Sequence, residues 1–129
     1  MSSNDNKLKK LERNISQLER ISNYKQNWNG YGAEPISSNL IIKVVHILNN
    51  LEHQPLIYAT ANGSIQLEYD NEETEDYLEI ELFEDGRIQL FTTMDNEHKS
   101  VAINEDEIQS IDEDEIQERV KEFMERRQE

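Results

Sequence analysis

Four carboxylates alternate with apolar residues in two neighbouring segments of the chain. The segment "SIQLEYD" (64–70) carries Glu68 and Asp70, and "DYLEIELF" (76–83) carries Glu79 and Glu81. If the segments pair as antiparallel strands, all four side chains share one face, where opposed like charges are destabilising. Such carboxylates can imitate the phosphates of a nucleic acid or attract a basic protein surface. The alternative is a solvated face of a generally acidic protein.

Two aromatic residues fall on the same face if the alternation holds, and they would supply apolar anchors of the kind that dominate interface energetics. The predicted partner-binding set is therefore Glu68, Asp70, Tyr77, Glu79, Glu81 and Phe83. The acidic segment 105–115 is a further candidate for the same role.

Metal sites are weakly supported. The stretch "DNEETEDYLEIE" (70–81) places Asp70, Glu72, Thr74 and Glu81 at the ligand positions of an EF-hand loop, but Glu75 stands where that loop requires glycine. The three histidines form no H-x-x-x-H or H-x-x-E pair. We predict no metal and no cofactor.

The stretch "NWNGYGAEPIS" (27–37) concentrates two glycines, a proline and the only tryptophan. Gly30 and Gly32 flank Tyr31, and both can adopt positive φ. The loop either presents Trp28 and Tyr31 to a ligand or reverses the chain between two helices, with the aromatic rings as packing groups. We favour the structural corner. Replacing Trp28 by alanine should then cost about 3–5 kcal/mol if the side chain is fully buried.

Charge and composition limit the classes of function. The chain has 129 residues and a formal net charge of −15. Residues 1–35 carry six Lys/Arg and four Asp/Glu, whereas residues 64–129 carry six and twenty-three, a balance of −17. Because phosphate binding needs clustered cations, we expect no direct nucleic-acid binding and favour a partner with a basic surface.

The length of the apolar runs and the absence of cysteine bear on the cellular location. None of the runs approaches a membrane span of ~20 residues, the start "MSSNDNKLKK" has no apolar core of a signal peptide, and there is no cysteine. We therefore expect a cytoplasmic protein without membrane contact.

The segment 7–28 is predicted to be helical because its apolar residues recur at spacings of three and four. The stripe comprises Leu8, Leu11, Ile15, Leu18 and Ile21. Its first four residues also fit a heptad seam, which offers a homodimer interface. We favour packing of the stripe on the domain's own sheet or on the next helix.

A second helix is predicted over 37–53, with Ser37 or Ser38 as its N-cap. This segment is apolar over more than half its circumference, so it should be the most buried helix. A third helix follows near the C-terminus, where Ile116, Val120 and Phe123 are spaced i, i+4, i+7.

Between residues 55 and 103 the apolar period changes to two, and the turn sequences "ANGS" (61–64) and "EDGR" (84–87) separate short segments. We predict an α+β fold with two N-terminal helices, an antiparallel β-meander of four to five strands and a C-terminal helix. Residues 1–129 form a single domain in this prediction, with frayed ends at 1–6 and 125–129.

Residues 27–91 resemble a recurrent family of small bacterial and phage-associated proteins. The family pattern is an Asn-Trp-Asp-Gly-Tyr-Gly-Ala-x-Pro-Ile corner followed by a helix and a Gly-turned meander. Here Asn29 stands where the family usually has Asp, and Tyr69 stands where it often has Trp. The biochemistry of that family is unassigned. The resemblance implies the fold and a prokaryotic or mobile-element setting, and it transfers no catalytic residue.

These features predict a non-catalytic acidic protein that binds and inhibits a macromolecular partner. The expected partner is a basic nucleic-acid-processing protein in phage–host or toxin–antitoxin conflict, so that the chain would act like an anti-CRISPR, an antitoxin or an immunity protein. The alternative is an oligomerisation module that pairs through the N-terminal helix. Binding through an acidic face should weaken as ionic strength rises, whereas pairing through leucines should persist. Removal of residues 1–25 should abolish the helix-mediated pairing and leave binding through the acidic face largely intact.

Overall fold

The fold is α+β, as predicted. The computed structural model describes residues 3–94, 97–103 and 113–126. The elements follow in the order α1 (Ser3–Ser22), α2 (Ser38–Asn50), β1 (Leu56–Ala59), β2 (Ile65–Asn71), β3 (Asp76–Leu82), β4 (Ile88–Met94), β5 (Glu97–Ile103) and α4 (Glu113–Met124). This order confirms two N-terminal helices, a meander and a C-terminal helix.

The five strands form one antiparallel sheet in the order β1-β2-β3-β4-β5, so each strand pairs with the next in sequence. Burial alternates along β2 and β3, with the apolar side chains pointing to one face. The period-two pattern of the sequence thus reports which face of each strand meets the core.

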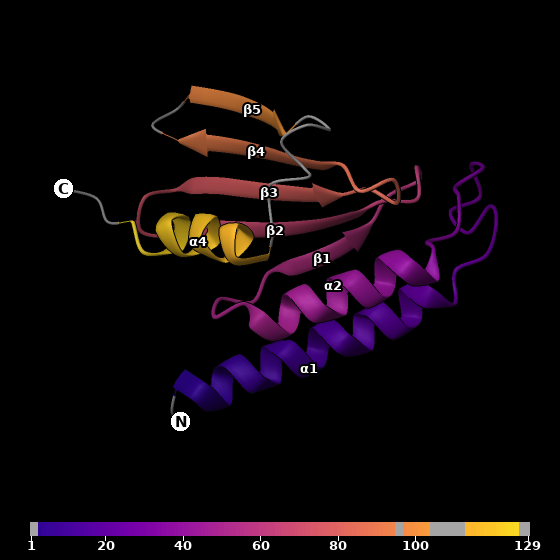
Figure 1. The fold of residues 1–129 in the computed structure, drawn as a ribbon, viewed down its shortest axis with the longest axis horizontal. Coiled ribbons are helices and arrows are strands. Elements are labelled where there is room, and N and C mark those ends of the chain that lie inside the picture. The colour runs from indigo at the N-terminus through magenta and orange to yellow at the C-terminus, as the bar shows by residue number, and fades with distance from the viewer. Residues whose placement is uncertain (1–2, 95–96, 104–112, 127–129) are drawn as a thin grey trace.

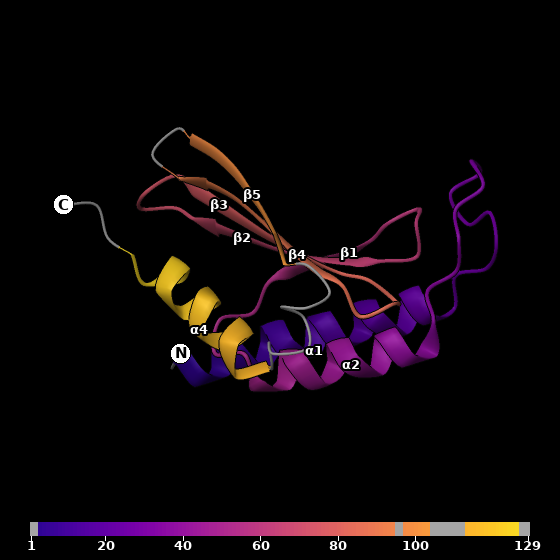
Figure 2. The same ribbon diagram turned by 45° about the horizontal axis from the view of Figure 1, so that its top comes forward.

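The helices lie on one side of the sheet (Figures 1 and 2). Helices α1 and α2 run side by side, and α1 also contacts β1. Helix α4 packs on β2 and α2. The apolar face of the sheet and the helices share one core, whose fully buried side chains include Ile47 and Ile80. The other face of the sheet has none of these helices on it.

Two tight hairpins use glycine where the sequence predicted turns. Backbone hydrogen bonds close the loops 60–64 and 83–87, and the fourth residue of each is a glycine with positive φ: Gly63 at 82° and Gly86 at 94°. Three residues lie between the two closing residues of each hairpin. The last of these three needs a left-handed backbone conformation, which glycine adopts without a steric penalty.

Helix α1 begins and ends earlier than predicted. It starts at Ser3, so residues 3–6 are helical where a frayed end was expected, and it stops at Ser22. The amides of Asn23 and Tyr24 bond to carbonyls three residues back, which tightens the final turn. Beyond it the Tyr24 ring stacks on Trp28 at 4.7 Å. Residues 23–28, which the sequence placed in the helix, therefore lie outside α1 and lead into the following loop.

Of the two serines predicted as possible N-caps of α2, Ser37 has this role: its hydroxyl accepts a hydrogen bond from the Leu40 amide at 3.2 Å. In the described part of the chain, α2 buries four apolar residues, more than α1 or α4: Leu40, Val44, Ile47 and Leu48. The predicted stripe of α4 is confirmed, because Ile116, Val120 and Phe123 are all buried.

The apolar stripe of α1 packs within the domain, as favoured above. Leu18 and Ile21 are buried in the core, and Leu11 packs against it, whereas Leu8 is 54% exposed. Leu18 is therefore not accessible to a second copy. Removing residues 1–25 would delete part of the core, so that truncation does not separate dimerisation from folding.

Candidate functional site

The side of the sheet away from the helices is the candidate site. Its side chains, which we call the open face, are Leu56, Tyr58, Gln66, Glu68, Asp70, Tyr77, Glu79, Glu81, Gln89, Phe91 and Thr93. The strand register arranges them in rows across the sheet. One row reads Leu56, Glu68, Glu79 and Phe91.

The register places the predicted carboxylates together. Glu68 lies directly opposite Glu79, and Asp70 lies opposite Tyr77. The Tyr77 hydroxyl donates to Glu79 Oε1 at 3.0 Å and is also within hydrogen-bonding reach of Glu68. One hydroxyl proton can serve only one of the two carboxylates at a time, so the pair retains unsatisfied negative charge.

This arrangement shifts the ionisation of both kinds of group. Partial burial raises the pKa of Glu68, and the charges of Glu79 and Asp70 raise it further, while the Tyr77 hydroxyl opposes the shift. The pKa of Tyr77 is raised by burial and by its carboxylate neighbours. At Glu68, therefore, the open face disfavours the charged form of the carboxyl group.

Titration of Glu68 gives a direct check. We expect its carboxyl to titrate above the ordinary value of 4.5. Because the folded state binds this proton more tightly than the unfolded chain, the contribution of Glu68 to stability falls as pH rises from 4.5 through the folded pKa. That contribution returns on acidification.

Carbon-13 NMR of the side-chain carboxyls measures the midpoint. The change Glu79→Gln should lower it, because one neighbouring negative charge disappears and a neutral amide oxygen competes less well than a carboxylate for the Tyr77 hydroxyl. The matched change Glu84→Gln, at an exposed turn position, should leave it unchanged. A wild-type midpoint at or below 4.5 would contradict the described environment.

Two residues of the predicted partner-binding set, Glu81 and Phe83, make side-chain contacts within the domain. Glu81 accepts hydrogen bonds from the Ser64 hydroxyl at 2.5 Å and from Gln66 Nε2 at 3.3 Å, which ties β3 to the β1–β2 hairpin. The Phe83 ring lies under the Arg87 guanidinium, whose central carbon is 4.4 Å from the ring centroid. The predicted set therefore splits into a group around Glu79, in which Asp70 is exposed and the other side chains are half-buried, and two residues that also have structural contacts.

The predicted partner-binding set lacks the three apolar or aromatic residues at the borders of the open face. Leu56 and Tyr58 of β1 are each 45% exposed, and Phe91 of β4 meets the Tyr77 ring edge-on at a centroid distance of 6.3 Å. They flank the central acidic strands on both sides. Their alternation was visible in the sequence, but only the register shows that they border Glu68 and Glu79.

The corner (residues 27–37) is held by its own hydrogen bonds. Asn29 Oδ1 accepts from the amides of Tyr31 at 2.8 Å and Ala33 at 3.2 Å, and Asn27 Oδ1 accepts from Gly32 N at 2.6 Å. The indole nitrogen of Trp28 donates to a carbonyl of the same loop at 2.7 Å. These bonds support the structural interpretation of the corner.

Trp28 is only half-buried, so the condition attached to its predicted stability effect is not met. Trp28→Ala removes one hydrogen bond and the stack on Tyr24, and we expect a loss of about 1–3 kcal/mol in the free energy of unfolding. Tyr31→Ala is the matched control, because the Tyr31 side chain is 92% exposed. It should change stability by less than about 0.5 kcal/mol in urea titrations. Equal losses in the two variants would contradict the structural role of Trp28.

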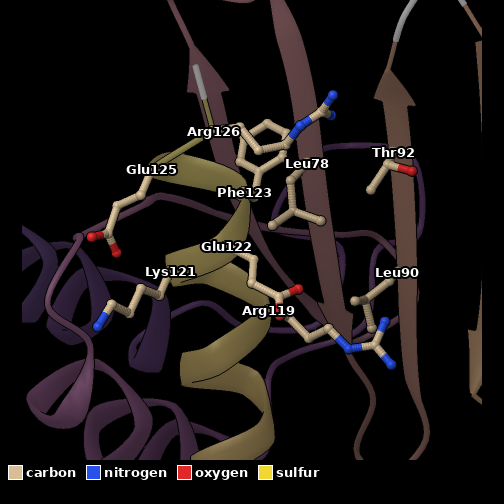
Figure 3. A pocket seen from close by; sticks show the side chains of 9 residues that line it. All are labelled: Leu78, Leu90, Thr92, Arg119, Lys121, Glu122, Phe123, Glu125 and Arg126. Carbon is tan, nitrogen blue, oxygen red and sulfur yellow. The ribbon is translucent and has the colours of Figure 1, made fainter. Parts of the chain in front are cut away.

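A groove of about 670 Å³ lies between α4 and the inner face of β3 and β4 (Figure 3). Leu78, Leu90 and Phe123 provide apolar lining, and the Arg119 and Arg126 side chains reach toward the strands, whereas Lys121 points away. None of the predicted site residues lines this groove.

The described residues also bear on metal sites and on membrane insertion. In residues 3–94, 97–103 and 113–126, no group of three or more His, Asp or Glu side chains is placed to hold a metal ion. Within those ranges, too, every helix is too short or too polar to cross a membrane. Residues 105–112 of the acidic C-terminal segment lie outside the described residues.

Comparison with protein-family models, with curated proteins and with solved structures finds no match to this chain. The resemblance carried by residues 27–91 therefore stays a prediction. The site is judged from its own geometry and charge.

Proposed function

We propose that this protein is a non-catalytic binding protein that uses its open face to occupy a basic surface of a macromolecular partner. The observation that carries the proposal is the direct cross-strand opposition of Glu68 and Glu79, with Asp70 beside them, on the face that the described helices α1, α2 and α4 leave uncovered. Opposed carboxylates destabilise the isolated sheet. A partner's Lys or Arg side chains would relieve that repulsion.

The proposed mode of action is competition with nucleic acid. Carboxylates spaced along two strands present negative charge where a phosphate backbone would present it, so a nucleic-acid-processing protein is the expected target. A phage–host or toxin–antitoxin setting suits such an inhibitor, as does action in the cytoplasm. The aromatic and aliphatic borders, Tyr58, Tyr77, Phe91 and Leu56, would add apolar contact area to the charged centre.

Helix-mediated pairing has less support from the geometry. Of the four residues predicted for a homodimer seam, Leu18 is fully buried within the domain, Leu11 and Ile15 are half-buried, and only Leu8 is exposed. A seam that includes Leu18 would require α1 to leave its own core.

Affinity capture with charge variants tests the proposal. The immobilised protein is incubated with lysate of the cells that naturally produce it, at about 50 mM and about 500 mM salt. The triple variant Glu68→Gln, Asp70→Asn, Glu79→Gln removes charge from the open face. The control variant Glu12→Gln, Glu19→Gln, Glu52→Gln removes the same charge from exposed positions on and beside α1 and α2.

We expect a basic protein to be captured by the wild type and by the control at low salt, with at least about tenfold less on the face variant. Capture should fall at high salt. Equal capture by both triple variants would show that only net charge matters and would overturn the proposed face. Salt-independent self-association as the sole result would favour the oligomerisation module instead.

A further inference from the structure

We propose that Tyr31 is an aromatic anchor that inserts into a concave pocket of the same protein partner. This inference rests on the proposed function, because it adds the tip of the corner to the interface formed by the open face. It also reverses the idea of a ligand-binding loop: here the loop supplies the inserted group and the partner supplies the cavity.

The exposure of Tyr31 is the first observation. Its side chain is 92% exposed, the highest value among the large apolar side chains of the described residues; Ile42 follows at 66%. The other aromatic residue of the corner, Trp28, has an internal hydrogen bond and a stacking partner. No described packing contact accounts for the aromatic ring at position 31.

The rigidity of the loop is the second observation. Asn27, Gly30 and Gly32 have φ of 66°, 79° and 84°, and the loop closes on itself through Asn27 N to Ala33 O at 2.7 Å and Gly30 N to Asn27 O at 3.0 Å. These bonds add to those of the asparagine side chains described above. A loop fixed before binding loses little conformational entropy on association, and a tyrosine has few rotatable bonds to immobilise.

The surroundings of the ring decide what it can bind. A Cβ atom at Gly30 or Gly32 would have no atom within 4 Å beyond the adjacent residues, so the backbone on both sides of Tyr31 is open. The corner lines neither the groove beneath α4 nor three smaller grooves among the described residues, which lie beside α1. A protruding ring without its own cavity cannot enclose a small molecule. With a net charge of −15, a nucleic-acid partner is disfavoured, which leaves a protein pocket.

The position of the corner links it to the open face. The Glu34 amide donates to the Ala61 carbonyl at 2.9 Å, which fixes the corner to the turn between β1 and β2. Both ribbon views show the corner extending from the helix layer past the end of this hairpin (Figures 1 and 2). Tyr58, exposed on the open face, belongs to the same hairpin. One partner can therefore contact both.

Site-specific photo-crosslinking in the cells that naturally produce the protein tests the anchor. The probe is p-benzoyl-phenylalanine, placed singly at position 31, at Gln89 on the open face, or at Glu19, an exposed control on α1. We expect the probes at 31 and 89 to form a covalent adduct with the same protein, identified by mass, and the probe at 19 to form none.

Each result is informative. An adduct from position 89 without one from 31 would overturn the anchor and leave the proposed function intact. An adduct from 31 without one from 89 would support the anchor and overturn binding through the open face. Adducts from neither position would overturn both, and a nuclease-sensitive adduct at 31 would replace the protein pocket by nucleic acid.

Affinity for the identified partner gives the second readout. We expect Tyr31→Ala to weaken binding at least tenfold while its unfolding midpoint stays that of the wild type, and Tyr31→Phe to retain most of the affinity. Unchanged affinity in Tyr31→Ala would overturn the inference even if the crosslink forms, because proximity alone does not make an anchor.

Discussion

Replacing Ile47 by alanine is expected to lower the free energy of unfolding by about 2–5 kcal/mol. Ile47 is 1% exposed and lies on the side of α2 that faces the core. Truncation removes buried apolar surface and leaves a cavity that the surrounding helices and sheet fill only in part. The whole free energy of unfolding of a native protein is about 5–15 kcal/mol, so this loss is a large share of it.

The same helix provides a matched control. Ile42 is an isoleucine of α2 as well, but its side chain is 66% exposed. Ile42→Ala removes the same atoms without opening a cavity, and alanine has the higher helix propensity, so we expect a change within about 0.5 kcal/mol. Urea titrations of the two variants measure the difference. Similar losses from both would mean that α2 does not present the described face to the core.

Replacing Asn71 by aspartate is expected to cost about 2–4 kcal/mol and to loosen α4 in particular. Asn71 is buried at the end of β2, and its Nδ2 donates to the carbonyls of Phe123 at 2.9 Å and Arg126 at 3.1 Å. Its Oδ1 accepts from the amides of Glu73 and Thr74 in the following turn. One side chain thus closes the helix end and shapes the turn.

Aspartate separates these two roles. It keeps an acceptor for the turn, but it removes the donor and places a negative charge against the C-terminal carbonyls of α4, where the helix dipole is already negative. The buried carboxylate of Asp76, which pairs with Arg126 at 3.1 Å, lies directly opposite in the sheet and adds repulsion. The loss should therefore exceed that of a single hydrogen bond.

Two measurements distinguish this mechanism from general destabilisation. Hydrogen exchange at the amides of Ile116 and Val120 should accelerate more than exchange in β3, because α4 would detach first. Asn62→Asp, in the exposed β1–β2 turn, makes the same chemical change and should stay within about 0.5 kcal/mol of the wild type. Unaltered protection of α4 in Asn71→Asp would show that Asn71 does not hold the helix.

Polar contacts between distant segments also fix the C-terminal end of α2 to α1. Asn14 of α1 is 1% exposed and donates to the Pro55 carbonyl at 2.9 Å and to Gln54 at 3.2 Å. Gln54 in turn donates to the carbonyls of Leu48 and Leu51 at the end of α2. The sequence pattern assigns neither Asn14 nor Gln54 a role, because Asn14 and its partners lie 40 and 41 residues apart in the chain.

What the sequence determined follows from local physics. The spacing of Ile116, Val120 and Phe123, the alternation along β2 and β3, and the glycines of the two hairpins each restrict the backbone within a few residues. Such signals predicted the α+β order, the strand faces and a serine cap for α2 at position 37 or 38. They also located the carboxylates on the polar side of the strands, because a one-residue shift would have moved them into the core.

Tertiary structure decided the rest, because it depends on which distant segments meet. Leu8 and Leu18 belong to one stripe, yet only Leu18 is covered. The register alone places Glu68 opposite Glu79 and Phe91 beside them, and only the fold of the corner leaves Tyr31 exposed while Trp28 turns inward to a carbonyl. Each outcome depends on long-range packing and pairing energies, which a local pattern of residue types does not encode.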